Sequence, residues 1–455
     1  MTETNFSAEE HGARTVFRLA WPLTLKSMML FGIVVIDALL VAPLGEAALA
    51  AMGLASSLGG LLVGTLFAFS NATQISLSRA HGSGDALRIR TAFYSGLCIN
   101  AILGVVSILL VILFGRWVIE QFAHTPDIAA DATAYLFAFL GVIVAEVLAT
   151  ALTNYYNAVG NTRRPLLSYM ISLPINVGLS AALIFGFAFF PALGVLGAAI
   201  GSVVASAIRA MYLALSMSRD TDWLRASQGW HGGSLPIAFR RQLVFALPIA
   251  GTFLSGTTAA TASGLIYAKL NVNEFAAMTL ILPWIQFIGA VGMGWAQGAG
   301  IIVGQMLGAN ATSSHLDRFL REAWQGALLA AAIVAAVYVT VCLGSSVLYA
   351  NLETETRLAL YAFLPVLLFL PFPKGSNAMC GHTLRAGGDT IYVMNLFVVS
   401  QWFVRVPAAF VLVVVLEAHV TLVLATLLLE ELVKFFPFHS RFRMGRWKVI
   451  RPTTD

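Results

Sequence analysis

Residues 16–42 read VFRLAWPLTLKSMMLFGIVVIDALLVA, an apolar run with Arg18 near its beginning and Lys26 and Asp37 deeper inside it. A helix of about 20 apolar residues crosses the roughly 30 Å of hydrocarbon in a bilayer, so this run is long enough to span a membrane. It is too long for the apolar core of a signal peptide and lacks a convincing cleavage site. We therefore expect an uncleaved first transmembrane helix.

Similar runs recur along the whole chain of 455 residues, which is 58% hydrophobic, only 11% charged and has a mean hydropathy of +0.82. A soluble surface needs about 25% charged residues, so an ordinary soluble enzyme is excluded. The sequence predicts an all-α polytopic membrane protein of about twelve helices. The spans are expected near 15–41, 48–78, 92–114, 131–157, 166–189, 193–217, 241–268, 275–305, 322–348, 357–385, 391–415 and 419–438.

The two halves of the chain resemble each other. LAWPL around Pro22 recurs as FALPI around Pro248, an offset of 226 (248 minus 22), and the loop SRAHGSGDALRIRTAF matches GQMLGANATSSHLDRFLREA at the same offset. AVGNT, ending at Thr162, recurs as AGGDT, ending at Thr390, an offset of 228 (390 minus 162). Because each half holds an even number of helices, the repeats are expected to run parallel, related by a pseudo-twofold axis along the membrane normal.

This repeat predicts two six-helix bundles with a central cavity, able to rock against each other. We place an N-lobe at 14–217, a cytoplasmic connecting loop at 218–240, a C-lobe at 241–440 and a basic cytoplasmic tail at 441–455.

Loop charge predicts the orientation in the membrane. With the N-terminus inside, the outer loops keep only Arg116, Lys269 and Arg357, while the other loop arginines and lysines lie inside. Basic residues favour the cytoplasmic side, so both termini are predicted to be cytoplasmic, in a cell inner membrane. The net charge of +5 is thus interpreted as a topology signal, and no nucleic-acid partner is expected.

Several further motifs follow one another in a distinctive order. They are IDALLVAPLGEAALAAMG at 36–53, YNAVGNTRRP leading into LPIN at 156–176, PALGVLGAAI at 191–200, LRAGGDT at 384–390 and EELVK at 430–434. With them the chain resembles the multidrug and toxic compound extrusion (MATE) antiporters over essentially its whole length. The resemblance implies twelve helices in two lobes and export of hydrophobic, often cationic compounds in exchange for H⁺ or Na⁺.

The resemblance implies small amphiphilic substrates in a lipid bilayer and no cofactor beyond the coupling ion. A membrane enzyme would need clustered His, Asp or Ser residues at an interface, and none is found, so no enzyme activity is expected. We also expect the protein to function as a monomer. No nucleotide-binding motif is present, so an ion gradient is expected to supply the energy. A flippase for a lipid-linked sugar or another amphiphile shares the architecture, and Lys26, Lys374 and Arg405 keep that alternative open.

Asp37 is the leading candidate for ion coupling. An Asp at the centre of a membrane helix costs about 3 kcal/mol on insertion scales, so it is a candidate functional residue. Low dielectric disfavours its charged form, which suits a carboxylate that exchanges protons. The resemblance places the coupling-ion Asp of the family at this position. The simpler alternative is a structural acid that caps a helix or pairs with a basic residue.

Asn176 and Tyr135 complete the ion-coupling set that the resemblance implies. Asn176 follows Pro174, a residue that frees backbone carbonyls, and the family carries a network linking these positions with Asp37. Ordinary interhelical hydrogen bonding is the alternative. Ser180 stands where certain members have a second Asp, which favours H⁺, although Na⁺ at Asp37 and Asn176 stays open.

Glu146, Phe31 and Met28 are predicted to line the substrate cavity. Glu146 lies mid-span without a visible local partner, so it either faces the cavity or is a neutral acid bonded between helices. Methionine adapts to diverse ligands, although most Met and Phe side chains here are expected to face lipid or the core.

The second half carries charges at depth as well. Lys374 and Arg405 fall inside predicted spans, and Glu430 and Glu431 lie at a similar depth in the last span. We expect these four residues to form a buried salt-bridge network, more structural than functional. In some relatives an acid stands at position 374, so an ion path through this lobe is doubtful.

Overall fold

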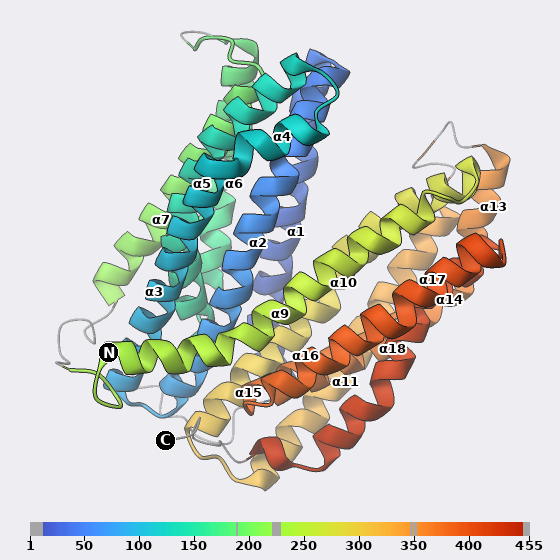
Figure 1. The fold of residues 1–455 in the computed structure, drawn as a ribbon. Coiled ribbons are helices and arrows are strands. Elements are labelled where there is room, and N and C mark those ends of the chain that lie inside the picture. The colour runs from blue at the N-terminus through green and yellow to red at the C-terminus, as the bar shows by residue number, and fades with distance from the viewer. Residues whose placement is uncertain (1–11, 188–189, 221–228, 346–348, 350–352, 449–455) are drawn as a thin grey trace. The chain divides into compact units, whose positions relative to one another are not determined.

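A computed structural model describes residues 12–187, 190–220, 229–345, 349 and 353–448. Every regular element in those ranges is helical, which confirms the predicted fold class (Figure 1). Residues 221–228 of the predicted connecting loop and residues 449–455 of the predicted tail lie outside the described residues.

The long helices follow the predicted spans closely. The first half contains α1 (Ala13–Val41), α2 (Glu46–Gly82), α3 (Ala86–Leu110), α4 (Arg116–Phe122), α5 (Pro126–Ala158), α6 (Arg163–Phe185) and α7 (Val195–Asp220). The second half contains α9 (Leu235–Tyr267), α10 (Val272–Gly308), α11 (Ser313–Leu343), α13 (Thr354–Ala362), α14 (Leu364–Phe369), α15 (Pro371–Ala386), α16 (Thr390–Val399), α17 (Val406–Phe410) and α18 (Val420–Arg443). The π-helical turns η2 (Val111–Gly115), η3 (Ser400–Arg405) and η4 (Val411–Val415) continue their neighbouring helices, and short 3₁₀ turns η1 (Ala42–Leu44) and η5 (Arg446–Lys448) follow α1 and α18.

Ten helical segments within the described ranges are long and apolar enough to cross a membrane. An eleventh arises if the segments before and after Leu370, which are bent by 42°, form one broken span. The predicted twelfth span corresponds to α18, whose middle carries Glu430, Glu431 and Lys434. These three charges keep α18 from counting among the apolar spans.

The internal repeat is visible in backbone geometry. The amide of Asn161 donates to the carbonyl of Tyr156 at 2.8 Å, and the amide of Asp389, at the repeat offset of 228 (389 minus 161), donates to that of Leu384 at 2.9 Å. The glycine that precedes each donor has a positive φ, +85° in the first turn and +92° in the second. Such values favour glycine, so the two loops share one turn conformation.

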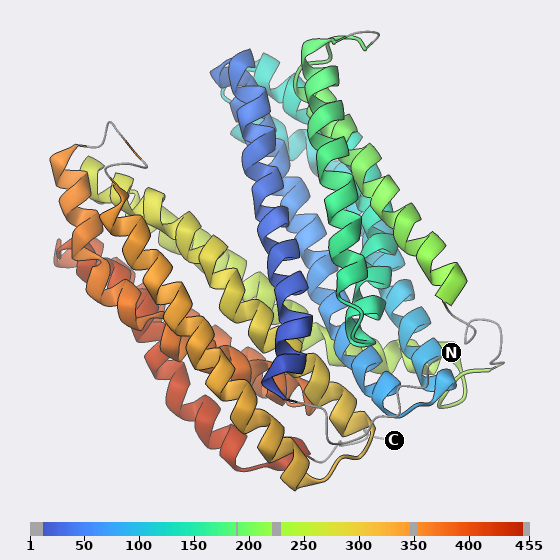
Figure 2. The same ribbon diagram turned by 180° about the vertical axis from the view of Figure 1, so that it is seen from behind.

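The chain forms two compact units. The N-unit is Leu25–Ala246, and the C-unit combines Met1–Thr24 with Leu247–Asp455. In the N-unit α5 packs against α2 and α7, and α6 packs against α7; in the C-unit α15 packs against α10, α11 and α18 (Figures 1 and 2). The first turns of α1 thus belong with the second half of the chain, a division that differs from lobes at 14–217 and 241–440.

Small residues of α10 allow the start of α1 to pack closely in the core of the C-unit. Val16, Leu19 and Leu23 are almost fully buried there in one apolar cluster with residues of α10 and α11. A side chain at Gly294 would collide with the hydroxyl of Thr24, and one at Gly298 would lie 3.4 Å from the carbonyl of Val16. These glycines of α10 therefore permit close helix contact, as small residues do in membrane bundles.

The start of α9 is held within the N-unit by polar contacts. Ser76 of α2 donates to the Gln242 side-chain oxygen at 2.8 Å. Just before α9, the backbone amide of His231 donates to the Thr91 hydroxyl at 2.9 Å. The unit boundaries at positions 24/25 and 246/247 thus fall inside α1 and α9, next to Pro22 and Pro248.

Gly197 of α7 provides a test of this packing. A Cβ at Gly197 would lie 2.6 Å from the carbonyl carbon of Leu183 in α6, so Gly197→Ala forces the backbones apart. We expect a loss of about 1–3 kcal/mol in stability, measured as a lower melting temperature by size-exclusion chromatography after heating.

The matched control is Gly178→Ala in α6, because no atom lies within 4 Å of a Cβ built there. Equal melting temperatures for the two variants would contradict the close α6–α7 contact.

Candidate functional site

Asp37 lies on α1 within the N-unit. Its side chain is only 7% exposed, and its Oδ1 atom is buried without a hydrogen-bond partner. Tyr135 of α5 stacks on Phe139 at a ring separation of 6.0 Å, and its hydroxyl lies beside Ser56 and within electrostatic reach of Asp37. The predicted pair of Asp37 and Tyr135 is therefore close in space.

Asn176 and Ser180 of α6 face α7. The Asn176 amide donates to the Ser202 hydroxyl at 3.0 Å, while its Oδ1 atom is buried and unpaired. The Ser180 hydroxyl is likewise buried and unpaired, against Gly201, where a side chain would collide with it. No hydrogen bond joins Asp37 and Asn176 within the described ranges, so the predicted network has no direct bond between them.

Glu146 has a partner that the sequence did not reveal, and its place at a substrate cavity stays a prediction. One oxygen of its buried carboxylate, Oε1, forms an ion pair with Arg209 of α7, and the other is unpaired. The Arg209 guanidinium lies 4.3 Å from the centre of the Tyr169 ring. Lys26 of α1 lies within electrostatic reach of Arg209, which repels it. Sequence reasoning missed Arg209, although a lone arginine in the predicted sixth span was a signal of the same kind as Lys26.

The other predicted cavity residues lie on α1. Phe31 is 44% exposed, and Met28 is partly buried. No polar contact marks either residue as part of a site, so their role stays a prediction.

Three of the four predicted C-lobe charges meet in the C-unit. Arg405 donates to Glu430 at 2.9 Å, and the Lys434 ammonium donates to both Glu430 and Glu431, each at 2.9 Å. Glu431 also accepts the Asn377 amide at 2.8 Å. Lys434 was missed, although its spacing of three and four residues from the two acids in EELVK is the ordinary spacing of helical ion pairs.

The fourth predicted charge, Lys374 of α15, stays apart from this network. Within the described ranges it makes no ion pair and no hydrogen bond. Its side chain is partly buried and lines a narrow pocket of about 20 Å³ together with Gly289, Tyr338 and Pro371.

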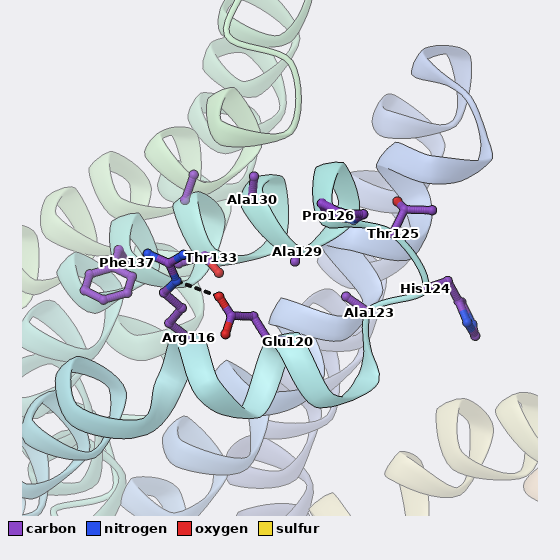
Figure 3. A pocket seen from close by; sticks show the side chains of 11 residues that line it. Arg116, Glu120, Ala123, His124, Thr125, Pro126, Ala129, Ala130, Thr133 and Phe137 are labelled. Carbon is purple, nitrogen blue, oxygen red and sulfur yellow. Dashed lines mark hydrogen bonds and ion pairs between the residues drawn. The ribbon is translucent and has the colours of Figure 1, made fainter.

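A larger hollow of about 760 Å³ lies in the N-unit, where α4 is followed by α5 (Figure 3). Arg116 and Glu120 of α4 face it and form a hydrogen-bonded ion pair of 2.7 Å. Residues of α5 such as Phe137 form the opposite wall. None of the residues predicted to bind an ion or substrate lines this hollow, so we assign it no role.

A comparison with known families decides the identity of the fold. The family model described as MatE matches the chain twice, at residues 22–182 and 248–411. The chain belongs to the MatE family. The starts of the two matched segments differ by 226 (248 minus 22), which is the offset between Pro22 and Pro248.

Individual relatives agree with this assignment. The chain is 25% identical over 409 residues to a protein of Bradyrhizobium diazoefficiens named "Probable multidrug resistance protein NorM", covering 87% of this chain and 85% of that one. It is also similar to a crystal structure of MATE in complex with MaL6, with a TM-score of 0.83, 17% identity and coverage of 95% and 96%. An outward-facing multidrug resistance MATE family transporter gives a TM-score of 0.81 at 18% identity, with coverage of 96% and 97%.

This MatE family member is therefore a polytopic membrane transporter with the two-bundle fold, and it is not an enzyme, as predicted.

The Glu146–Arg209 pair of the MatE chain supports a stability prediction. Glu146→Gln leaves the Arg209 charge buried without its carboxylate, which costs about 3–5 kcal/mol for a broken buried pair. We expect a clear fall in folded yield and melting temperature.

The double variant Glu146→Gln with Arg209→Gln removes both charges and is expected to recover much of the loss. A double variant as unstable as Glu146→Gln alone would contradict the pairing.

Proposed function

We propose that the chain is a secondary antiporter that exports hydrophobic, often cationic compounds in exchange for H⁺, or alternatively Na⁺. The single observation that carries the proposal is Asp37, an acid buried in α1 with an unpaired carboxylate oxygen. The name of the relative from Bradyrhizobium diazoefficiens, a probable multidrug resistance protein, supports drug-like substrates.

Asp37 has the surroundings of a group that changes its charge state. Its Oδ1 atom lacks a hydrogen-bond donor, so the protein leaves part of the carboxylate unsatisfied. A buried carboxylate without donors is costly, and a bound proton or cation removes that cost. In the proposed cycle Asp37 takes up the ion from one side of the membrane and releases it when substrate binds from the other.

Neighbouring polar groups support H⁺ over Na⁺ as the ion. Sodium needs several oxygen ligands around one point; the buried Oδ1 atoms of Asp37 and Asn176 are unpaired, so Na⁺ stays the alternative ion. Ser180 is uncharged and lies against Gly201, so it adds no negative charge. A single proton on Asp37, with Tyr135 beside it, needs no such ligand set.

Because α1 is one continuous helix, it can couple ion binding at Asp37 to movement of the units. The same helix carries Asp37 in the N-unit and Val16 to Leu23 in the core of the C-unit. Pro22 lies near the boundary, and a proline inside a helix removes a backbone hydrogen bond and favours bending there. We propose that protonation of Asp37 biases this helix between two shapes while the units alternate access to the substrate.

The distribution of basic loop residues supports a location in the inner membrane with both termini in the cytoplasm.

A flippase for lipid-linked sugars is less favoured by the charges. Such a substrate needs several free cations around its diphosphate. Of the three cations that keep this alternative open, Arg405 is paired with Glu430, and Lys26 and Lys374 are left to serve this purpose. Arg405 is thus neutralised within the C-unit.

Replacement of the carboxylate tests the proposal. We expect Asp37→Asn to slow ethidium efflux from energised cells by about tenfold or more, because an amide cannot take up and release a proton at this position. The measurement is the rise of cellular ethidium fluorescence at matched protein levels.

Glu120→Gln is the control, since it removes an exposed acid of the same unit whose partner is Arg116. Efflux that survives in Asp37→Asn, or that fails equally in both variants, would overturn the role of Asp37.

The coupling ion can be tested in proteoliposomes with imposed gradients. We expect a pH gradient without Na⁺ to drive uptake of ethidium, and a Na⁺ gradient at equal pH to drive none, because the uncharged Ser180 supplies no second carboxylate to hold Na⁺. The reverse result would assign Na⁺ coupling, and export without either gradient would refute antiport.

A further inference from the structure

The internal repeat relates the buried charges of the two units. Glu146 and Lys374 are separated by an offset of 228 (374 minus 146), which also relates the turns after α5 and α15. Tyr169 and Phe397 share this offset, and each ring carries a cation: Arg209 at 4.3 Å from the first and Lys434 at 4.5 Å from the second. The two clusters therefore occupy equivalent positions in the repeat, but the acid Glu146 of the first corresponds to the base Lys374 of the second.

This inversion changes how each cation is neutralised. In the N-unit the Glu146 carboxylate neutralises the Arg209 guanidinium through an ion pair. In the C-unit Lys374 is itself positive and cannot neutralise Lys434. Glu430 and Glu431, which lie on α18 with Lys434, neutralise it instead. The acids of α18 thus neutralise Lys434, and Lys374 makes no ion pair within the described ranges.

A count of the charges in the C-unit cluster also leaves one positive charge without a partner. Arg405, Lys434 and Lys374 contribute three positive charges, and Glu430 and Glu431 contribute two negative ones, which leaves one positive charge. Lys374 is attracted to Glu430 and Glu431 by electrostatic interaction without direct contact, and it is repelled by Lys434 and Arg405. A cation in a membrane span without an ion pair is expensive unless an anion can reach it.

The pocket beside Lys374 leaves room for such an anion. A methyl group added at Gly289 would lie 3.8 Å from the Lys374 nitrogen and 3.3 Å from the Tyr338 hydroxyl, so both polar atoms border the same space. The Tyr338 hydroxyl already donates its proton to the carbonyl of Ile285 at 2.8 Å. Lys374 is therefore the hydrogen-bond donor that these two side chains can offer a ligand.

The size of the pocket limits the ligand. A volume near 20 Å³ holds about one water-sized group, enough for a carboxylate oxygen and far too little for a diphosphate. Met293, Leu370 and Pro371 supply apolar walls, where low dielectric strengthens an ion pair.

We propose that Lys374 and this pocket form a carboxylate-binding subsite in the C-unit. The subsite extends the substrate range from cationic amphiphiles to zwitterions and anions that carry a carboxylate. This inference rests on the proposed export of amphiphiles and names a chemical class of substrate within it.

Two dyes that differ in one group test the subsite. Rhodamine B has a free carboxylate, and its ethyl ester does not. With the purified full chain in nanodiscs, fluorescence polarisation is expected to show that Lys374→Met weakens binding of rhodamine B by about tenfold or more, the usual scale for a lost charged hydrogen bond, and that of the ester by less than about twofold.

Two variants serve as controls. Lys374→Arg keeps the charge and is expected to retain rhodamine B binding. Lys269→Met removes an exposed lysine of the same unit and is expected to leave both dyes unaffected. Equal weakening of both dyes in Lys374→Met, or no change in either, would overturn the proposal.

Competition in the unaltered protein decides the matter if Lys374→Met fails to fold. Benzoate is expected to displace rhodamine B, whereas benzamide is not, and failure of benzoate to compete would refute the subsite. Efflux of the ester from cells reports on the proposed function separately. If cells export the ester while the dyes are not discriminated, only the subsite fails; if the ester is neither bound nor exported, both proposals fail.

Discussion

Each unit must satisfy its buried charges from within itself, because hydrocarbon offers no water to do so. The Glu146–Arg209 pair meets this constraint in the N-unit, and the cluster of Arg405, Glu430, Glu431 and Lys434 meets it in the C-unit. Within the described ranges, Asp37, Lys26 and Lys374 make no ion pair. A membrane protein keeps such costly groups where a ligand completes them. Function is therefore expected where a buried charge has no partner of opposite charge.

Much of the fold could be predicted from the sequence, because its causes are local. Apolar length fixed the helices, and the glycine turns at residues 160 and 388 preserved the repeat in both spacing and backbone angle. The division into units could not be read in the same way. It depends on whether the first turns of α1 pack against α10, and that depends on the glycines at 294 and 298 facing α1, a matter of tertiary structure.

The candidate site was predicted in part for a similar reason. Asp37, Glu146 and the two acids of EELVK are visible as charges within apolar runs, so they could be named from the sequence. Which of them has a partner depends on residues from other helices, and Arg209 lies on α7, two long helices beyond the α5 helix that carries Glu146. Sequence therefore identified the groups that need partners, whereas the structure identified the groups that have none.

The packing of the first turns of α1 within the C-unit has a consequence for the order in which the protein folds. Val16 and Leu19 leave the ribosome early, yet the residues that enclose them, such as Ile302 and Phe319, are translated much later. The C-unit core thus cannot close while the early helices are being inserted. The first turns of α1 can therefore reach their final packing only after α10 and α11 have been synthesised, which ties completion of this helix to later synthesis.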